Sequence, residues 1–210
     1  MPDVEYAAAS VPCEGEDVCG DRMLFASTKK GFIFGVVDAI GHGKDAAVLS
    51  DAVIDTIGNS QVAEDAEDYL PQLFKQCHER LRQTRGAALS LAVFDVQSNA
   101  MQWLGIGNVS GMIISRDRSG MASYHPLLVQ SGVVGDRLAY LKPVQRTLRP
   151  GDTFIVTTDG IRPSFADRLP TRFTPRSLAN HIIDTYRMRR DDALVLVARY
   201  RKCGHAGNCD

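Results

Sequence analysis

The 210-residue chain predicts an α+β fold in which helices cover mostly antiparallel β-sheets. Short runs of β-branched and aromatic residues, bounded by glycine, proline or asparagine, recur along the chain and are typical of strands. Two stretches with apolar residues at helical spacing follow one another directly between such runs. Consecutive helices of this kind do not fit the regular strand–helix alternation of a parallel sheet.

The first third of the chain begins with strands and continues with helices. A Lys29-Lys30-Gly31 turn precedes an apolar run that predicts a buried strand. The apolar face of the second helix predicts packing against a sheet. The expected elements here are strands over residues 4–11, 22–28 and 32–38, and helices over residues 44–57 and 67–82.

The rest of the chain predicts a meander of strands with one more helix near the end. Pro175 stands in the first turn of that helix, where its missing N–H leaves no hydrogen bond unmade. The expected elements are strands over residues 87–96, 101–106, 110–115, 121–124, 137–141, 144–148, 153–158 and 193–200, and a helix over residues 175–188.

Composition limits the class of protein. A formal net charge of −1 argues against general nucleic-acid binding, which needs a marked basic excess. No apolar run approaches the length of a membrane-spanning helix, and the first residues lack the layout of a signal peptide. We therefore expect a cytoplasmic protein with no membrane partner, whose five cysteines are reduced thiols.

The last residues contain a possible zinc ligand set. Cys203, His205 and Cys209 offer three soft ligands in a glycine-rich tail without an obvious fourth. The alternative is a flexible terminus over residues 201–210, and the sequence favours it.

Several aspartates stand where predicted strands begin or end. Asp38 closes the run from Phe32, Asp159 follows a second run, and Asp191-Asp192 and Asp21 directly precede two more. Crowded carboxylates are costly unless a cation neutralises them, and oxygen ligands favour hard ions such as Mg²⁺ or Mn²⁺ over zinc. Spacing alone leaves open the alternative that each is a solvated turn residue.

The order of these motifs resembles a known family. The chain contains Gly20-Asp21, Asp38-x-x-Gly-His-Gly, Gly107-Asn108, Thr158-Asp159-Gly160 and Arg190-Asp-Asp-Ala-Leu, between about Cys19 and Tyr200. Together they resemble the metal-dependent PPM/PP2C serine/threonine phosphatases, in the bacterial sporulation-phosphatase branch. Arg85-Gly86-Ala87 before a strand most resembles the small RsbX-type members, which reset stressosome proteins.

The resemblance implies a more detailed fold than the periodicity does. It implies two stacked, mostly antiparallel sheets flanked by helices (an αββα sandwich), with the metals at one end. It further implies a single phosphatase domain over residues 1–200.

The same resemblance assigns roles to residues. It implies two ions, Mn²⁺ or Mg²⁺, with Asp38 bridging both and the Ala39 carbonyl contacting one. Asp159 and Asp191 would hold the other side of the cluster, and Asp21 would act through a water or a hydrogen bond. The family usually has glycine where this chain has Ala39, so a backbone that needs positive φ there would be strained.

Accessory roles are less determined. His42 is a candidate general acid for the leaving oxygen, or else a turn residue that hydrogen-bonds the loop. Gly41 and Gly43 are expected as turn formers near the substrate, and Asp192 as a supporting hydrogen-bond acceptor. Asn108 replaces an acid of larger relatives and is expected to be structural.

The predicted function is metal-dependent hydrolysis of phosphoserine or phosphothreonine on STAS-domain stressosome proteins, by attack of a metal-activated water. Two alternatives remain open. One is a catalytically weak binding module that keeps the fold, and the other is a small-molecule phosphohydrolase.

Overall fold

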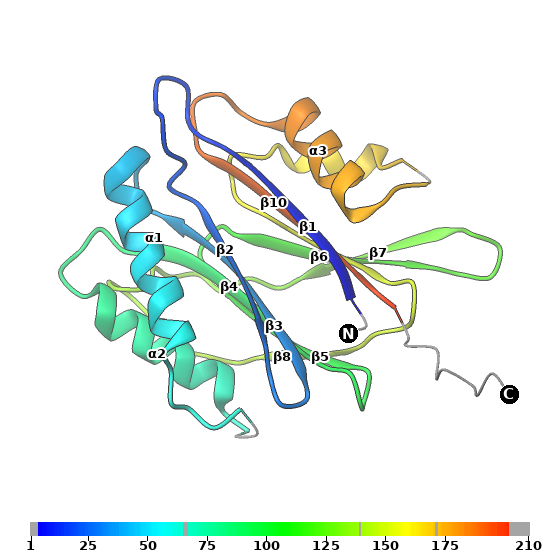
Figure 1. Cartoon of the computed structure of the whole chain (residues 1–210), viewed down its shortest axis with the longest axis horizontal. Helices are drawn as coiled ribbons and strands as arrows, with labels where there is room; N and C mark the ends of the chain where they lie inside the picture. The colour runs from blue at the N-terminus through cyan, green and yellow to red at the C-terminus, as the bar shows by residue number, and fades with distance from the viewer. Residues whose placement is uncertain (1–3, 65–66, 139, 171, 202–210) are drawn as a thin grey trace, which may run out of the picture.

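A computed structural model describes residues 4–64, 67–138, 140–170 and 172–201. Two five-stranded sheets lie face to face with helices on their outer surfaces (Figure 1). The first sheet has the order β1-β10-β9-β6-β7 and the second has the order β2-β3-β4-β5-β8. All pairings between these strands are antiparallel.

The elements follow one another in the predicted manner, strands first and two helices together. The strands are β1 (Val4–Val11), β2 (Arg22–Ser27), β3 (Gly31–Ala39), β4 (Ala87–Asp95), β5 (Ala100–Ile106), β6 (Ser110–Arg116), β7 (Ala122–Leu127), β8 (Val144–Thr147), β9 (Thr153–Thr157) and β10 (Ala193–Tyr200). The helices are α1 (Gly43–Gly58), α2 (Tyr69–Leu81), the 3₁₀ helix η1 (Pro163–Arg168) and α3 (Pro175–Tyr186).

Strand β3 shows how the sequence creates two cores from one strand. Ile33, Val37 and Ala39 belong to the core beneath α1 and α2. Phe34 and Val36 belong to the core between the two sheets. Because successive side chains of a strand point to opposite faces, the apolar run of β3 is buried on both sides.

Helices cover the outer face of each sheet. The α1–α2 pair packs on the second sheet, and α3 packs on β1 and β10 of the first. Thr174 and Ser177 form a capping box at the start of α3, which satisfies backbone donors that the helix leaves unpaired. The layers are therefore helix, sheet, sheet and helix, as the family resemblance implied.

The core between the sheets is aromatic. Phe34, Phe94, Phe154 and Trp103 are all almost fully buried and contact one another edge to face. A Cβ on Gly111 would lie 2.6 Å from the indole of Trp103, so only glycine fits beneath that ring. This packing joins the two sheets inside the sandwich.

One predicted element is absent from the described residues, and one observed element was not predicted. Residues 137–141 do not form a strand in the described part, where only an isolated bridge joins Arg137 to Val133. The 3₁₀ helix η1 was not predicted, because six residues are too few to show helical periodicity.

Two further observations concern the ends and the helices. Cys203, His205 and Cys209, the possible zinc ligands, lie outside the described residues. None of the helices in the described ranges is long and apolar enough to cross a bilayer.

Candidate active site

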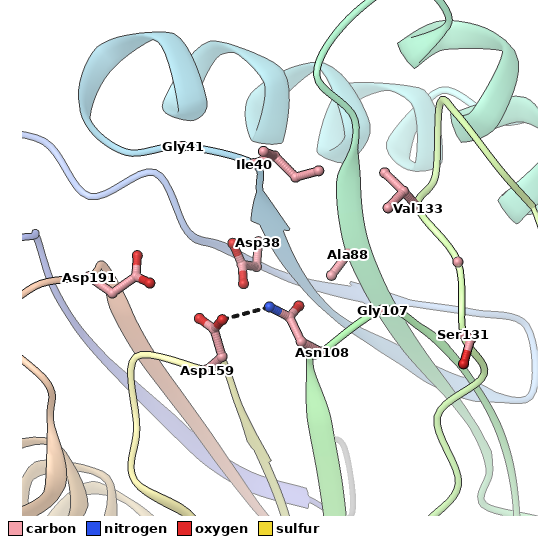
Figure 2. Close-up of a pocket in the computed structure, with 11 residues that line it drawn as sticks. Asp38, Ile40, Gly41, Ala88, Gly107, Asn108, Ser131, Val133, Asp159 and Asp191 are labelled. Carbon is pink, nitrogen blue, oxygen red and sulfur yellow. Dashed lines mark hydrogen bonds between the residues drawn. The ribbon is translucent and has the colours of Figure 1, made fainter.

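A pocket of about 480 Å³ opens at one end of the sandwich, where the two sheets meet. Asp38 reaches it from the second sheet, and Asp159 and Asp191 reach it from the first. Figure 2 shows the three carboxylates facing a common space. The chain thus brings together the three residues that the sequence predicted as catalytic.

Strand alternation and register place the first two acids. Asp38 is the next inward position of β3 after Phe34 and Val36, so its carboxylate points between the sheets. Arg22 pairs with Val37 in the β2–β3 ladder. Asp21, one residue before Arg22, therefore lies beside Asp38.

Pairing of β9 with β10 places the other two acids. The ladder continues past Thr157 as Thr158 N–H donates to Leu194 O at 3.1 Å. Asp159 follows β9 as Asp191 precedes β10, so both lie at the same end. Between them, a Cβ on Gly160 would lie 1.9 Å from the Asp192 carbonyl oxygen, so the close approach of these two segments of the chain requires glycine.

Crowding perturbs the acids strongly. Burial, followed by the charges of Asp159 and Asp191, raises the pKa of Asp38 to about 7. Burial and the Asp38 charge raise the pKa of Asp21 to about 8, and the Thr158 hydroxyl partly offsets this. Burial and the Asp159 charge also raise the pKa of Asp191. The site thus holds more negative charge than its own residues neutralise.

Asp192 has a different position from its neighbour. It is only 3% exposed, and its two oxygens accept hydrogen bonds from Cys13 N–H and Gly20 N–H, each at 2.7 Å. Both oxygens are therefore occupied in holding the segment between β1 and β2 against the start of β10. The predicted supporting role fits these contacts.

The Gly-His-Gly turn forms the rim of the pocket. Gly41 has φ of 111° and Gly43 has φ of 72°, a region that favours glycine, as expected of turn formers. Of the two, Gly41 lines the pocket. His42 is exposed, contacts Glu16 through Nδ1 at 2.7 Å and is not among the lining residues.

Ala39 is accommodated without strain. It is the last residue of β3, is 1% exposed and faces the core beneath the helices. Its φ is not positive, so the conformational penalty considered for a non-glycine residue is absent. The carbonyl role of Ala39 toward a metal remains a prediction.

The donor set fits hard divalent ions. Oδ2 of Asp21 is buried with no hydrogen-bond partner in the described part of the chain, and a buried unpaired carboxylate oxygen is costly. Within the same ranges, no three His, Cys, Asp or Glu side chains approach closely enough to ligate one ion together. Mg²⁺ prefers oxygen ligands, keeps several waters and needs only one or two carboxylates, so the oxygen donors of the site suit it better than zinc.

The sequence marked one further lining residue, Asn108, as structural and did not mark the others. Asn108 Nδ2 donates to Asp159 Oδ2 at 2.7 Å and also bonds Asp38, which lowers the pKa of that acid. Ser131, Gly132 and Val133 form the far wall. The Gly107-Asn108 motif marks Asn108 in the sequence. No motif marks residues 131–133, which only tertiary contacts bring to the site.

Residues 28–201 match the family model described as Stage II sporulation protein E (SpoIIE). The chain belongs to the SpoIIE family. This bears out the resemblance seen in the motifs.

Individual relatives of this SpoIIE-family chain agree. It is 26% identical over 187 residues to phosphoserine phosphatase RsbX of Bacillus subtilis (strain 168), with 89% of each chain covered. A solved structure concerning the bacterial stressosome, a modular system adapted to control secondary messenger signalling, has a TM-score of 0.81 at 29% identity and covers 93% of this chain and 99% of that one. RsbX in complex with magnesium has a TM-score of 0.76 at 22% identity, covering 93% and 94%.

Fold and family together place the SpoIIE-family chain among the PP2C-type phosphatases, which are metal-dependent. The predicted α+β class and the αββα sandwich are confirmed.

Proposed function

We propose that this chain hydrolyses phosphoserine or phosphothreonine on STAS-domain stressosome proteins, with two Mg²⁺ or Mn²⁺ ions. The observation that carries the proposal is the convergence of Asp38, Asp159 and Asp191 from both sheets on one pocket. Residues 1–200 would act as one catalytic unit.

Each acid has a distinct task in the proposal. Asp38 is central, because its carboxylate lies between the acids of the first sheet and the buried Asp21. It would bridge the two ions, with Ala39 O, Asp159 and Asp191 completing the donors. Two such metal ions, when bound, supply a water of lowered pKa and neutralise the charge on the phosphoryl oxygens.

Residues around the acids would hold and orient them. Asn108 would fix the Asp159 carboxylate through its 2.7 Å hydrogen bond, and Asp21, buried beside Asp38, would act through a water or a hydrogen bond. Asp192 keeps the segment before β2 in place.

His42 keeps two proposed roles. Its contact with Glu16 at the rim supports a turn residue that hydrogen-bonds the loop, and the alternative is a general acid that donates a proton to the leaving oxygen. We propose Gly41, which lines the pocket with φ of 111°, as a turn former that shapes its rim near the substrate.

The stressosome substrate is supported by two likenesses, to phosphoserine phosphatase RsbX and to a stressosome-related structure.

Phosphate release tests this directly. The substrates are a serine-phosphorylated STAS-domain protein, its threonine-phosphorylated form and free phosphorylated metabolites, each with Mg²⁺, with Mn²⁺ or with EDTA. We expect metal-dependent release from the protein, lost in Asp191→Asn and kept in Asp184→Asn, an exposed change on α3. Faster release from metabolites would refute the protein substrate, and metal-independent release would refute the metal centre.

A further inference from the structure

The pocket has two chemically different halves. The acids and Asn108 form one half. The opposite half is lined by Ile40, Ala88, Gly132 and Val133 with the hydroxyl of Ser131, and none of the described residues that line it is ionisable. A metal centre and a phosphoryl group need only the acidic half, so the second half requires its own explanation.

Ile40 is the unusual residue in that half. It directly follows the strand that carries Asp38, yet its side chain is 45% exposed. A large apolar residue left open inside a pocket is more informative than one on a convex surface. Figure 2 shows it extending toward the side where Ala88 and Val133 lie.

The loop does not need an apolar side chain at position 40 to hold its shape. The backbone itself fixes the residue, because Ile40 N–H donates to Gly86 O at 3.0 Å. A polar residue would keep that bond and be better hydrated. The exposed apolar surface is therefore available for a ligand.

Val133 is held rigidly on the other side of this half. Its N–H donates to Arg137 O at 2.9 Å, and the next residue, Val134, exchanges two backbone hydrogen bonds with Ala87 at 3.0 and 2.9 Å. Gly86, with φ of 80°, leaves room for it, since a Cβ there would lie 2.5 Å from Val133 Cγ1. Such preorganised apolar surface is the kind that binds a side chain with little ordering cost.

We infer that the apolar half of the pocket, formed by Ile40, Ala88 and Val133, binds an apolar side chain next to the phosphorylated residue of a protein substrate. The inference rests on the proposed function, because it places the phosphate in the acidic half. Phosphoserine is short, so its neighbours in the substrate chain must enter the same cavity. A small hydrophilic phosphoester has nothing to place in this half.

The test compares three probes and three variants. The probes are free O-phosphoserine and two phosphoserine peptides, identical except that the residues flanking the phosphoserine are leucine in one and serine in the other. The variants are Ile40→Ser, Val133→Ser and the matched control Val48→Ser, which changes a valine that is 66% exposed on α1 and outside the pocket.

We expect the wild-type protein to favour the leucine peptide in kcat/KM by about tenfold, the scale set by small apolar differences in a pocket. Ile40→Ser should reduce this preference to near unity, by raising KM for the leucine peptide more than KM for the serine peptide or for O-phosphoserine. Val133→Ser should act in the same direction, and Val48→Ser should match the wild type. Melting temperatures identify any variant that misfolds.

The outcomes separate this inference from the proposed function. If the wild type hydrolyses the peptides without preference, or if Ile40→Ser slows all three probes equally, the apolar half does not read the substrate. If it hydrolyses none of them, the proposed function fails. Dissociation constants of the two peptides with the wild type and Ile40→Ser then decide the inference alone: a preference lost in Ile40→Ser supports it, and equal constants in the wild type overturn it.

Discussion

Crowding of carboxylates around Asp38 has a direct consequence for stability. Replacement of Asp38 by Asn keeps the shape of the side chain and removes one charge. In the metal-free protein this relieves a buried acid that its neighbours repel. We expect Asp38→Asn to be more stable than the wild type in EDTA at pH 8, although it should be inactive.

The magnitude follows from the raised pKa. An acid that titrates at 3.8 when unfolded and at about 7 when folded destabilises the folded state by about 4 kcal/mol once fully ionised. This penalty is absent below pH 3.8, where the acid is protonated in both states, and it is complete above about pH 7. The wild type should therefore lose stability as pH rises through this window.

Thermal unfolding in EDTA between pH 4 and pH 8 measures the effect. For a chain of this size, about 4 kcal/mol corresponds to roughly 10 °C in melting temperature at pH 8, and the difference from Asp38→Asn should vanish at pH 4. Mg²⁺ or Mn²⁺ should raise the melting temperature of the wild type and not of the variant. Asp184→Asn, on the exposed face of α3, should resemble the wild type throughout. A destabilised Asp38→Asn at pH 8 would refute the crowding.

Three further predictions concern other parts of the site. Asp192→Ala should lower the free energy of unfolding in urea by about 3 kcal/mol, because two short hydrogen bonds to buried backbone are lost. Asp191→Ala should abolish phosphate release and lower stability little. The reverse pattern would contradict a structural role for Asp192 and a catalytic role for Asp191. Gly160→Ala should prevent stable folding, because the new Cβ would lie 1.9 Å from a backbone oxygen. A normal melting temperature would show that the two segments of the chain lie further apart at this point. Arg85→Ala should raise the KM for a phosphoprotein severalfold at low salt, because the Arg85 guanidinium packs over Gly41 beside the pocket. Arg82→Ala should leave this KM unchanged, because Arg82 is exposed and forms its ion pair with its own helix.

Strand alternation made the individual strands predictable, whereas the stacking of two sheets was implied by the family resemblance. Runs such as Phe32–Asp38 carry their own signal, because side chains on both faces of a central strand are buried. The same rule explains why the acids converge: Asp21 and Asp38 continue inward rows of adjacent strands. The sequence shows the rows, but only the β2–β3 register shows that these two residues lie side by side.

The far wall of the pocket could not be predicted in the same way. Residues 131–133 follow β7 in an irregular segment with no periodicity, and a strand was predicted wrongly over 137–141. Backbone bonds from Val134 to Ala87 place this segment, and such pairings between distant residues leave no local pattern. The exposure of Ile40 could not be predicted from the sequence either, because it depends on how the surrounding elements pack.

The origin of the acids in separate sheets has a mechanical consequence. Asp38 belongs to one layer, and Asp159 and Asp191 to the other, whereas the aromatic side chains join the layers mainly further along the sandwich. A divalent ion bound by acids of both sheets would link the sheets at the open end of the sandwich. Occupancy of the metal site would then govern how far the sheets separate there, so that the ion concentration would set both the chemistry and the rigidity of the pocket entrance.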